Sequence, residues 1–172
     1  MRVRDAGIGD AQILCSIYNH YIEHTTVTFE EQALQPEEYA GRIDTILQRY
    51  PWLVIEDDGQ VLGYAYAGEW KPRSAFRYTV ESSIYLHPQA PKRTGMGEML
   101  YRALLSRLAD EGFHQVIAAI TIPNEGSIAL HHKLGFSEAG RFHEVGYKFQ
   151  CWIDVVYMEL QLDFFKGLYN DG

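Results

Sequence analysis

The chain has 172 residues, 47% of them hydrophobic and 22% charged, which predicts one globular domain with a sizeable core. The 15 basic and 23 acidic residues give a net charge of −8 without a long basic run, which disfavours a nucleic-acid-binding protein. Neither a membrane span nor the apolar core of a signal peptide is recognisable. We therefore expect a cytoplasmic protein that binds neither nucleic acid nor membrane.

Hydrophobic periodicity predicts an extended segment at 2–5, then a helix over about 11–23 with Asp10 as its N-cap and a second helix over about 37–49 with Pro36 near its first turn. Further along, turn residues and patterning predict strands over about 52–56, 61–67, 77–86 and 116–120, helices over about 96–111 and 126–134, and two or three closing strands near 136–142, 145–149 and 152–161. This order predicts an α/β sandwich with a mixed sheet.

We expect one domain over 1–163, followed by a C-terminal tail over 164–172 that carries no readable signal. Cys15 and Cys151 stand in no CxxC or metal-ligand spacing, so they are expected to be free thiols in a reducing cytosol. The seven histidines form no HExxH pattern, and we expect no metal site.

A glycine-containing loop, PKRTGMG (91–97), lies between a predicted strand and the N-terminus of a predicted helix. Glycines allow the backbone to approach a ligand closely, and the first turn of the helix presents free N–H groups to an anion. Lys92 and Arg93 add positive charge, so a pyrophosphate fits there. The loop is neither a Walker A loop nor a Rossmann fingerprint, and taken alone it is better explained as a tight turn into a helix.

The surrounding sequence changes this interpretation. IYLHP (84–88), then KRTGMG (92–97), then an amphipathic helix resemble the coenzyme A motif of the GNAT family of N-acetyltransferases, with Lys92 where that family has Gln or Arg. NEGS (124–127) and ALHHKLGF (129–136) resemble a second family segment, in which His131 replaces a frequent tyrosine. The resemblance implies a single-domain α/β (α+β) fold with a mixed, mostly antiparallel sheet of about six to seven strands flanked by four helices.

A closer resemblance covers nearly the whole chain. It is carried by YNHYIE (18–23), RYPWLV (49–54), YAYAG (64–68), WKPR (70–73), ESSIY (81–85) and VGYK (145–148), which are similar to the phosphinothricin N-acetyltransferases. FRYTVE (76–81) and WID (152–154) are similar to the related enzymes that act on methionine sulfoximine and methionine sulfone. The resemblance implies acetyl-CoA as cosubstrate, a small amino-acid-like acceptor and a homodimer; the aromatic-rich C-terminal half also motivates the dimer.

The resemblance also implies a set of cofactor contacts. Backbone N–H groups near Ile84 and Leu86 are expected to bind the pantetheine arm and polarise the thioester, and the amide of Asn124 is expected to reach the same arm or to cap a helix ahead of Ser127. The full expected set is Ile84, Tyr85, Leu86, Lys92, Arg93, Thr94, Gly95, Met96, Gly97, Asn124 and Ser127.

Acetyl transfer to an amine requires loss of an ammonium proton, polarisation of the thioester and neutralisation of the leaving thiolate. Glu81 is the candidate general base, since it lies in an otherwise uncharged run where burial would raise the pKa of a carboxylate. The pattern alone fits a solvent-facing glutamate better, and the resemblance, in which the matching glutamate is the proposed base, reverses that order. His131 is the candidate general acid; a helix-face histidine like His132 is the open alternative.

Three cations within seven residues, Lys71, Arg73 and Arg77, are candidates for holding a carboxylate or phosphinate of the acceptor. The alternative is a solvated loop. Arg77 is the first candidate because we expect it on the strand, four residues before Glu81. Other acceptors, namely a polyamine, an aminoglycoside or a protein N-terminus, and a non-catalytic acetyl-CoA sensor remain as competing hypotheses.

Overall fold

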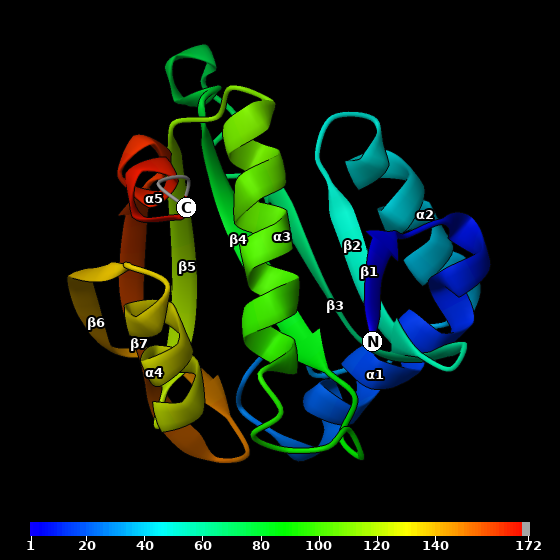
Figure 1. Ribbon diagram of the computed structural model, residues 1–172. Helices are drawn as coiled ribbons and strands as arrows, with labels where there is room; N and C mark the ends of the chain where they lie inside the picture. Colours follow the sequence, from blue (N-terminus) through cyan, green and yellow to red (C-terminus); the bar gives the residue numbers. More distant parts are fainter. Residues whose placement is uncertain (170–172) are drawn as a thin grey trace.

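One seven-stranded sheet organises the computed structural model, which describes residues 1–169, with side chains through Lys166 (Figure 1). The strand order is β1-β2-β3-β4-β5-β7-β6. All neighbouring strands are antiparallel except β4 and β5, which are parallel. A parallel pair inside an antiparallel sheet requires a crossover connection, and the helix between β4 and β5 provides it.

The elements have the following bounds. The strands are β1 (Arg2–Asp5), β2 (Trp52–Asp57), β3 (Gln60–Glu69), β4 (Thr79–Leu86), β5 (Gln115–Ile122), β6 (Ser137–Lys148) and β7 (Cys151–Gln161). The helices are α1 (Ala11–His24), α2 (Pro36–Leu47), α3 (Met96–Asp110), α4 (Glu125–Lys133) and α5 (Leu162–Tyr169), with short 3₁₀ turns at η1 (Ile8–Asp10) and η2 (Ser74–Phe76).

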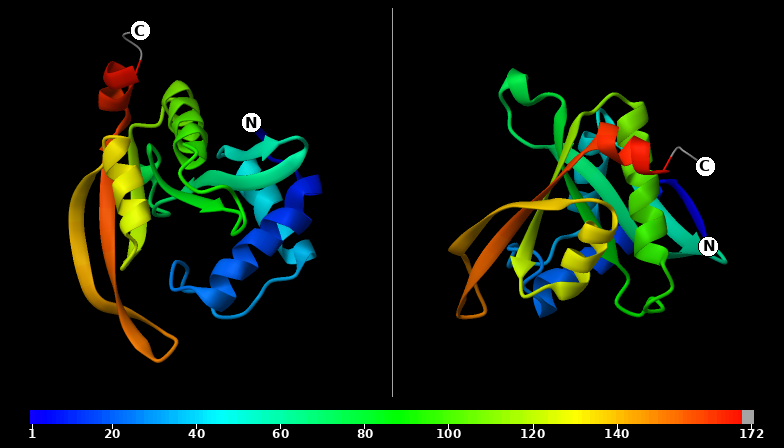
Figure 2. Two further views of the ribbon diagram at one scale, coloured as in Figure 1. Left: turned by 60° about the horizontal axis from the view of Figure 1, so that its bottom comes forward. Right: turned by 60° about the vertical axis from the view of Figure 1, so that its left-hand side comes forward.

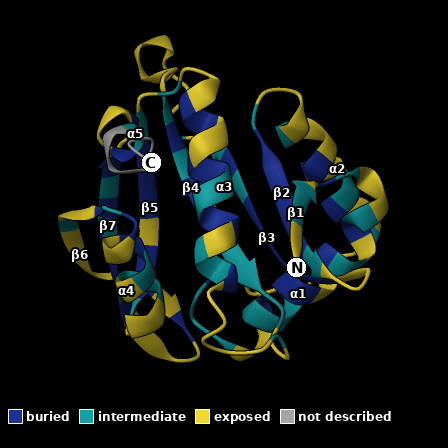
Figure 3. Ribbon diagram, in the orientation of Figure 1, coloured by how far each residue is buried: buried dark blue, intermediate teal, exposed yellow. Residues whose placement is uncertain are grey.

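Helices cover both faces of the sheet (Figure 2), and a hydrophobic core lies on each face. Helices α1 and α2 pack on one face, whereas α3, α4 and α5 pack on the other. Alternate residues of a strand point to opposite faces, so in β2 Leu53 and Ile55 join the α3 core while Trp52 and Val54 join the α1 core. Burial is accordingly strongest in the central strands and along the inner side of α3 (Figure 3).

The expected architecture is confirmed: a single mixed, mostly antiparallel sheet with helices on both faces. Two expectations need correction in detail. The closing segments form two strands, because β6 runs from 137 to 148 with irregular register between Phe142 and Gly146. Helix α5 was not expected at all. It is anchored by Leu162 and Phe165, which are buried in the α3 core, and by Lys166 Nζ, which donates to Ala109 O at 3.0 Å.

The expected N-cap position at Asp10 is confirmed, but the side chain does not cap the helix. Asp10 precedes α1, but its carboxylate makes no capping hydrogen bond to that helix. It accepts instead from the Gly7 backbone N–H at 2.9 Å and from the guanidinium of Arg4 at 2.8 and 2.9 Å. The reason is the 3₁₀ turn η1, which places Asp10 in a helical conformation before α1 begins, so its side chain closes that turn.

Within residues 1–169, none of the helices combines the length and the apolar composition that crossing a bilayer requires.

Candidate active site

The central feature of the site is a gap between β4 and β5. These parallel strands pair only at Thr79–Gln115, Val80–Val116 and Glu81–Ile117, and then separate. Beyond that point β4 stays paired to β3 as far as Leu86, and β5 stays paired to β7 as far as Ile122. The sheet therefore splits into two halves that diverge from Glu81 onward, and one edge of each strand has no neighbouring strand.

The backbone of β4 turns hydrogen-bonding groups toward this gap. His87 N–H donates to Leu62 O on β3 at 2.8 Å, so by antiparallel alternation Tyr85 and Ser83 also face β3. Ile84 and Leu86 then face the opposite way, into the gap. The carbonyl of Leu86 confirms this direction, since it accepts the hydroxyl of Tyr21 at 2.7 Å. The N–H groups of Ile84 and Leu86 are therefore available to a ligand between the strands.

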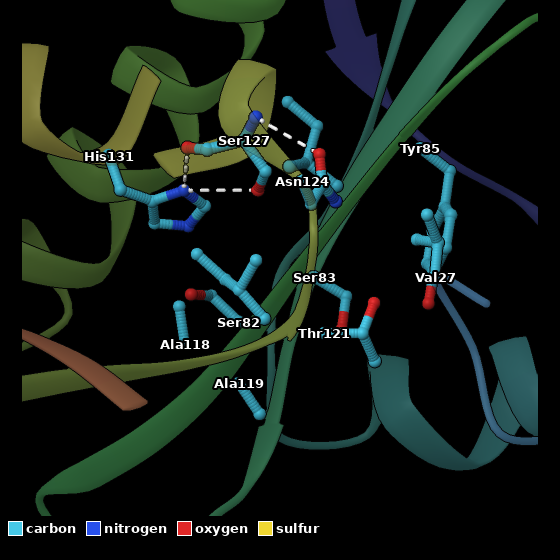
Figure 4. A pocket seen from close by; sticks show the side chains of 12 residues that line it. Val27, Ser82, Ser83, Tyr85, Ala118, Ala119, Thr121, Asn124, Ser127 and His131 are labelled. Atoms are coloured by element: carbon cyan, nitrogen blue, oxygen red, sulfur yellow. Dashed lines mark hydrogen bonds between the residues drawn. The ribbon is translucent and has the colours of Figure 1, made fainter. Parts of the chain in front are cut away.

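A cavity of about 50 Å³ occupies the gap (Figure 4). It is lined by β4, β5, the start of α4 and the loop after α1, and the lining residues are Val27, Ser82, Ser83, Ile84, Tyr85, Ala118, Ala119, Ile120, Thr121, Asn124, Ser127 and His131. Among the expected cofactor contacts, Ile84, Tyr85, Asn124 and Ser127 thus meet in one place, together with His131.

The glycine loop lies at the N-terminus of α3. Gly95 has φ = 77°, in the left-handed region that glycine adopts without strain, and α3 begins at the next residue. This turn leaves the first N–H groups of α3 without helical partners, which is the arrangement that binds phosphates. Lys92, Arg93 and Thr94 are exposed on the same loop. The loop can therefore receive an anionic group at the mouth of the gap.

Asn124 immediately precedes α4 and is the N-cap residue of that helix. Its Oδ1 accepts the N–H of Ser127 at 3.2 Å and so caps the helix, while the residue also lines the cavity. Capping uses the amide oxygen and leaves the Nδ2 donors for a ligand.

His131 is almost fully buried and held at both ring nitrogens. Its Nδ1 lies 2.7 Å from Ser127 O, and its Nε2 lies 3.0 Å from the hydroxyl of Tyr101. A carbonyl only accepts, so Nδ1 carries the proton and Nε2 accepts the hydrogen of Tyr101. Tyr101 in turn lies 2.6 Å from the hydroxyl of Ser82 on β4. The chain Ser82–Tyr101–His131–Ser127 thus connects β4 to α4 through α3.

Burial lowers the pKa of His131, against an opposing contribution from its bond to Ser127. The imidazole is consequently neutral near neutral pH, with its one N–H proton held by a carbonyl. This geometry is unfavourable for an imidazolium acid, and it places the side chain in the wall of the cavity.

Glu81 stands where β4 and β5 part, on the face opposite α3. Desolvation raises the pKa of its carboxyl group, and the positive charge of Lys71 opposes that shift. Tyr66 and Ser83 occupy paired positions on β3 and β4, and the side chain of Ser83 opposes the rise in the pKa of Tyr66 that burial causes. A partly desolvated carboxylate beside a gap lined with N–H donors has the properties of a general base for an amine.

Of the three expected cations, the structure brings Lys71 close to this carboxylate and leaves Arg73 and Arg77 in the exposed loop. Lys71 acts on Glu81 electrostatically, and its Nζ lies 5.0 Å from the centre of the Trp70 ring. Arg77 is not on the strand as expected, because β4 begins at Thr79. It follows the turn η2, where its Nη1 donates to Ser74 O at 3.1 Å. Arg73 is exposed ahead of the same turn.

Sequence reasoning missed Ser82, Tyr101 and Thr121, all of which contribute hydroxyls to the gap or its walls. In the sequence, Tyr101 looks like one more apolar position of α3. Its hydrogen bond to His131 joins residues thirty positions apart, so no local pattern reveals it. Among residues 1–169 no group of three or more His, Cys, Asp or Glu side chains is arranged to hold a metal ion.

Comparison with known proteins supports a family assignment. The family model described as an acetyltransferase (GNAT) domain matches residues 4–157. A phosphinothricin N-acetyltransferase of Streptomyces viridochromogenes is 41% identical, over 90% of this chain and 84% of its own length. An L-methionine sulfoximine/L-methionine sulfone acetyltransferase of Salmonella typhimurium is 40% identical, over 95% of both chains.

The fold is also shared with a solved structure that contains the cosubstrate. A phosphinothricin acetyltransferase from Sinorhizobium meliloti, in complex with acetyl-CoA, superposes with a TM-score of 0.89 and 38% identity, over 93% of this chain and 87% of that one.

The raised pKa of Glu81 predicts a pH-dependent gain in stability for Glu81→Gln. The folded protein holds the proton more tightly than the unfolded chain, so the wild type loses stability as pH rises above the ordinary value of 4.5. We expect Glu81→Gln to melt at a higher temperature than the wild type at pH 8, and the difference to shrink below pH 4.5, measured by thermal denaturation across pH. Glu138→Gln, at an exposed position of β6, is the matched control. An equal or lower melting temperature for Glu81→Gln at pH 8 would contradict the prediction.

Proposed function

This chain belongs to the GNAT acetyltransferase family, and on that basis we propose that it transfers an acetyl group from acetyl-CoA to the α-amine of a small amino-acid-like acceptor. The acceptors that we propose carry an anionic or tetrahedral tail, as phosphinothricin, methionine sulfoximine and methionine sulfone do. Acyl transfer itself follows from the family, whereas the choice of acceptor and the roles of individual residues are our proposals.

One observation supports the mechanism above all: a partly desolvated carboxylate, Glu81, stands at the point where β4 and β5 separate. In our proposal acetyl-CoA lies between the strands. Its phosphates face the N-terminus of α3 and Lys92, and its pantetheine arm pairs with the N–H groups of Ile84 and Leu86 and with Asn124. The thioester then lies close to Glu81, and an amine reaches it from the α1 face.

Direct attack accounts for every proton. Glu81, itself or through a water, takes one proton from the ammonium, and the neutral amine attacks the thioester carbon. The N–H of Ile84 stabilises the oxyanion that forms. When the C–S bond breaks, the nitrogen must lose a second proton and the thiolate must gain one. The proton that leaves the nitrogen can therefore neutralise the thiolate. Neutral His131 then orients the wall of the cavity and supplies no proton.

The positive charge near Glu81 favours an acceptor with an anionic group. Lys71 lies close enough to oppose the shift in the pKa of Glu81, and Trp70 packs edge-on against Tyr157 beside it. In our proposal Lys71, with Arg73 and Arg77 further along the exposed loop, attracts the acceptor's carboxylate. A polyamine or an aminoglycoside, which are polycations, would be repelled by the same loop. We place the enzyme in the cytoplasm and propose detoxification of such amino acids as one use.

We also propose that two copies of the chain form a dimer through the β6–β7 hairpin. Phe142, Tyr147, Phe149 and Trp152 are each more than half exposed there, and β6 is an edge strand of the sheet. A clustered aromatic surface of this kind is typical of an interface between subunits.

The acceptor and the base are tested together by release of free thiol from acetyl-CoA. We expect wild-type turnover with phosphinothricin, methionine sulfoximine and methionine sulfone that exceeds turnover with spermidine or an aminoglycoside.

Glu81→Gln should lower kcat by about 10²–10⁴-fold, with Glu138→Gln at the wild-type rate. The acid limb of the wild-type pH profile should lie above 4.5, because the pKa of Glu81 is raised. Turnover only with polyamines would overturn the acceptor, and cofactor binding without thiol release would favour the sensor.

Light scattering tests the dimer. The wild type should have twice the mass of one chain, 19.8 kDa, at micromolar concentration, and Trp152→Ser with Phe142→Ser should shift it toward the monomer. Ile8→Ser, which removes an exposed apolar side chain far from the hairpin in the sequence, is the control. A monomeric wild type would refute the proposal.

A further inference from the structure

A buried hydroxyl without a partner lines the cavity between β4 and β5. Thr121 is 6% exposed, and its Oγ1 makes no hydrogen bond to any residue that the structure describes. A buried hydroxyl that is left unpaired destabilises a protein, so such groups are rare and usually have a ligand. The other orphan within residues 1–169, Trp52 Nε1, lies in the aromatic cluster under α1 and is not part of this cavity.

The orphan hydroxyl faces the same side of the sheet as Glu81. On β5, Val116, Ala118 and Ile120 belong to the α3 core, so alternation turns Thr121 to the opposite face. On β4, Val80 belongs to the α3 core, so Glu81 and Ser83 also face away from it. Thr121 and Ser83 both line the cavity on this side (Figure 4).

The neighbouring hydroxyls differ from that of Thr121 in their surroundings. Ser83 lies opposite Tyr66 in the β3–β4 register and affects the pKa of the Tyr66 hydroxyl, and Ser82 is bonded to Tyr101 on the other face. The groups that we assign to the cofactor, the N–H groups of Ile84 and Leu86 and the amide of Asn124, lie on the strand edge and on α4. Thr121 is therefore a buried polar side chain left for a ligand on the acceptor side.

The position of Thr121 along the strands indicates which part of the acceptor it meets. Lys71, in the loop before β4, lies at the closed end of the gap near Glu81. Thr121 lies toward the open end, four residues beyond Ile117, the partner of Glu81. An amino acid with its carboxylate at Lys71 and its amine near Glu81 extends its side chain toward Thr121.

We propose that Thr121 Oγ1 donates a hydrogen bond to an oxygen on the tail of the acceptor, and so selects amino acids with a sulfone, sulfoximine or phosphinate over their apolar counterparts. This inference rests on the proposed function and adds a specificity-determining residue to it. A hydroxyl suits all three tails, because each presents an oxygen acceptor and a hydroxyl rotates to reach it.

The test compares Thr121→Val, which keeps the shape and removes the hydroxyl, with Thr121→Ser, which keeps the hydroxyl. We expect the KM of Thr121→Val for methionine sulfone to rise about 5–10-fold, the change expected for one hydrogen bond, and the KM for acetyl-CoA to stay within about twofold. L-Methionine, which has the same chain without sulfone oxygens, is the matched ligand, measured as substrate or inhibitor. Its affinity should change by less than about twofold, and Thr121→Ser should keep the wild-type preference for the sulfone.

Thermal denaturation of the unliganded variants gives the second measurement. Because the hydroxyl has no partner within the described chain, Thr121→Val should melt at or above the wild-type temperature while it binds the sulfone more weakly. A lower melting temperature with unchanged sulfone binding would overturn the proposal and assign the hydroxyl to a structural water. A rise in the KM for acetyl-CoA alone would overturn it by placing the hydroxyl on the cofactor. Absence of wild-type turnover with every amino acid would instead refute the proposed function.

Discussion

The parallel pairing of β4 with β5, which ends after Glu81 and Ile117, is the constraint on which the site depends. Each strand is fixed along its other edge, β4 by β3 and β5 by β7, so neither can bend to restore the pairing. Backbone groups that would have bonded across the sheet must find other partners. The protein satisfies one of them itself, since Tyr21 donates to Leu86 O. The N–H groups of Ile84 and Leu86 are left for a ligand.

The two faces of the split sheet have different chemistry. On the α3 face, a neutral chain of hydrogen bonds through Tyr101 and His131 holds α3, α4 and β4 together, and burial keeps both side chains uncharged. On the α1 face, Glu81 is the acidic group of the gap, with Lys71 near it. A thioester placed between the strands would therefore meet packing groups on one side and an acid–base group on the other. This division of roles depends on the fold, since Glu81 and Ser82 are adjacent in the sequence but point to opposite faces.

Much of this arrangement is predictable from the sequence. The glycine loop ahead of an amphipathic helix correctly predicts a tight turn into α3, where Gly95 adopts a left-handed conformation. The uncharged run around Glu81 alone fits a solvent-facing side chain better, and the family resemblance favours the desolvated carboxylate with a raised pKa that the structure has. The resemblance to the family then assigns the loop and Glu81 to one expected site. These features are local in the sequence, which is why patterns of a few residues reveal them.

The rest depends on contacts between distant segments. The partners of His131 and of Leu86 come from residues that are thirty and sixty-five positions away, and no local pattern encodes them. Arg77 was expected on β4, and a start of the strand two residues later moves it into the exposed loop. Helix α5 forms where its residues meet α3, through Phe165 and Lys166. The orphan hydroxyl of Thr121 is recognisable only when every neighbour of the side chain is known.

The central claim is that the gap between β4 and β5 binds acetyl-CoA through the backbone of β4. Amide hydrogen exchange, followed residue by residue by NMR with and without CoA, tests it most directly. The account predicts that CoA slows exchange at Ile84, Leu86 and the first turn of α3, while Tyr85, whose N–H already faces β3, changes little. Unchanged exchange at Ile84 and Leu86 under saturating CoA would contradict it.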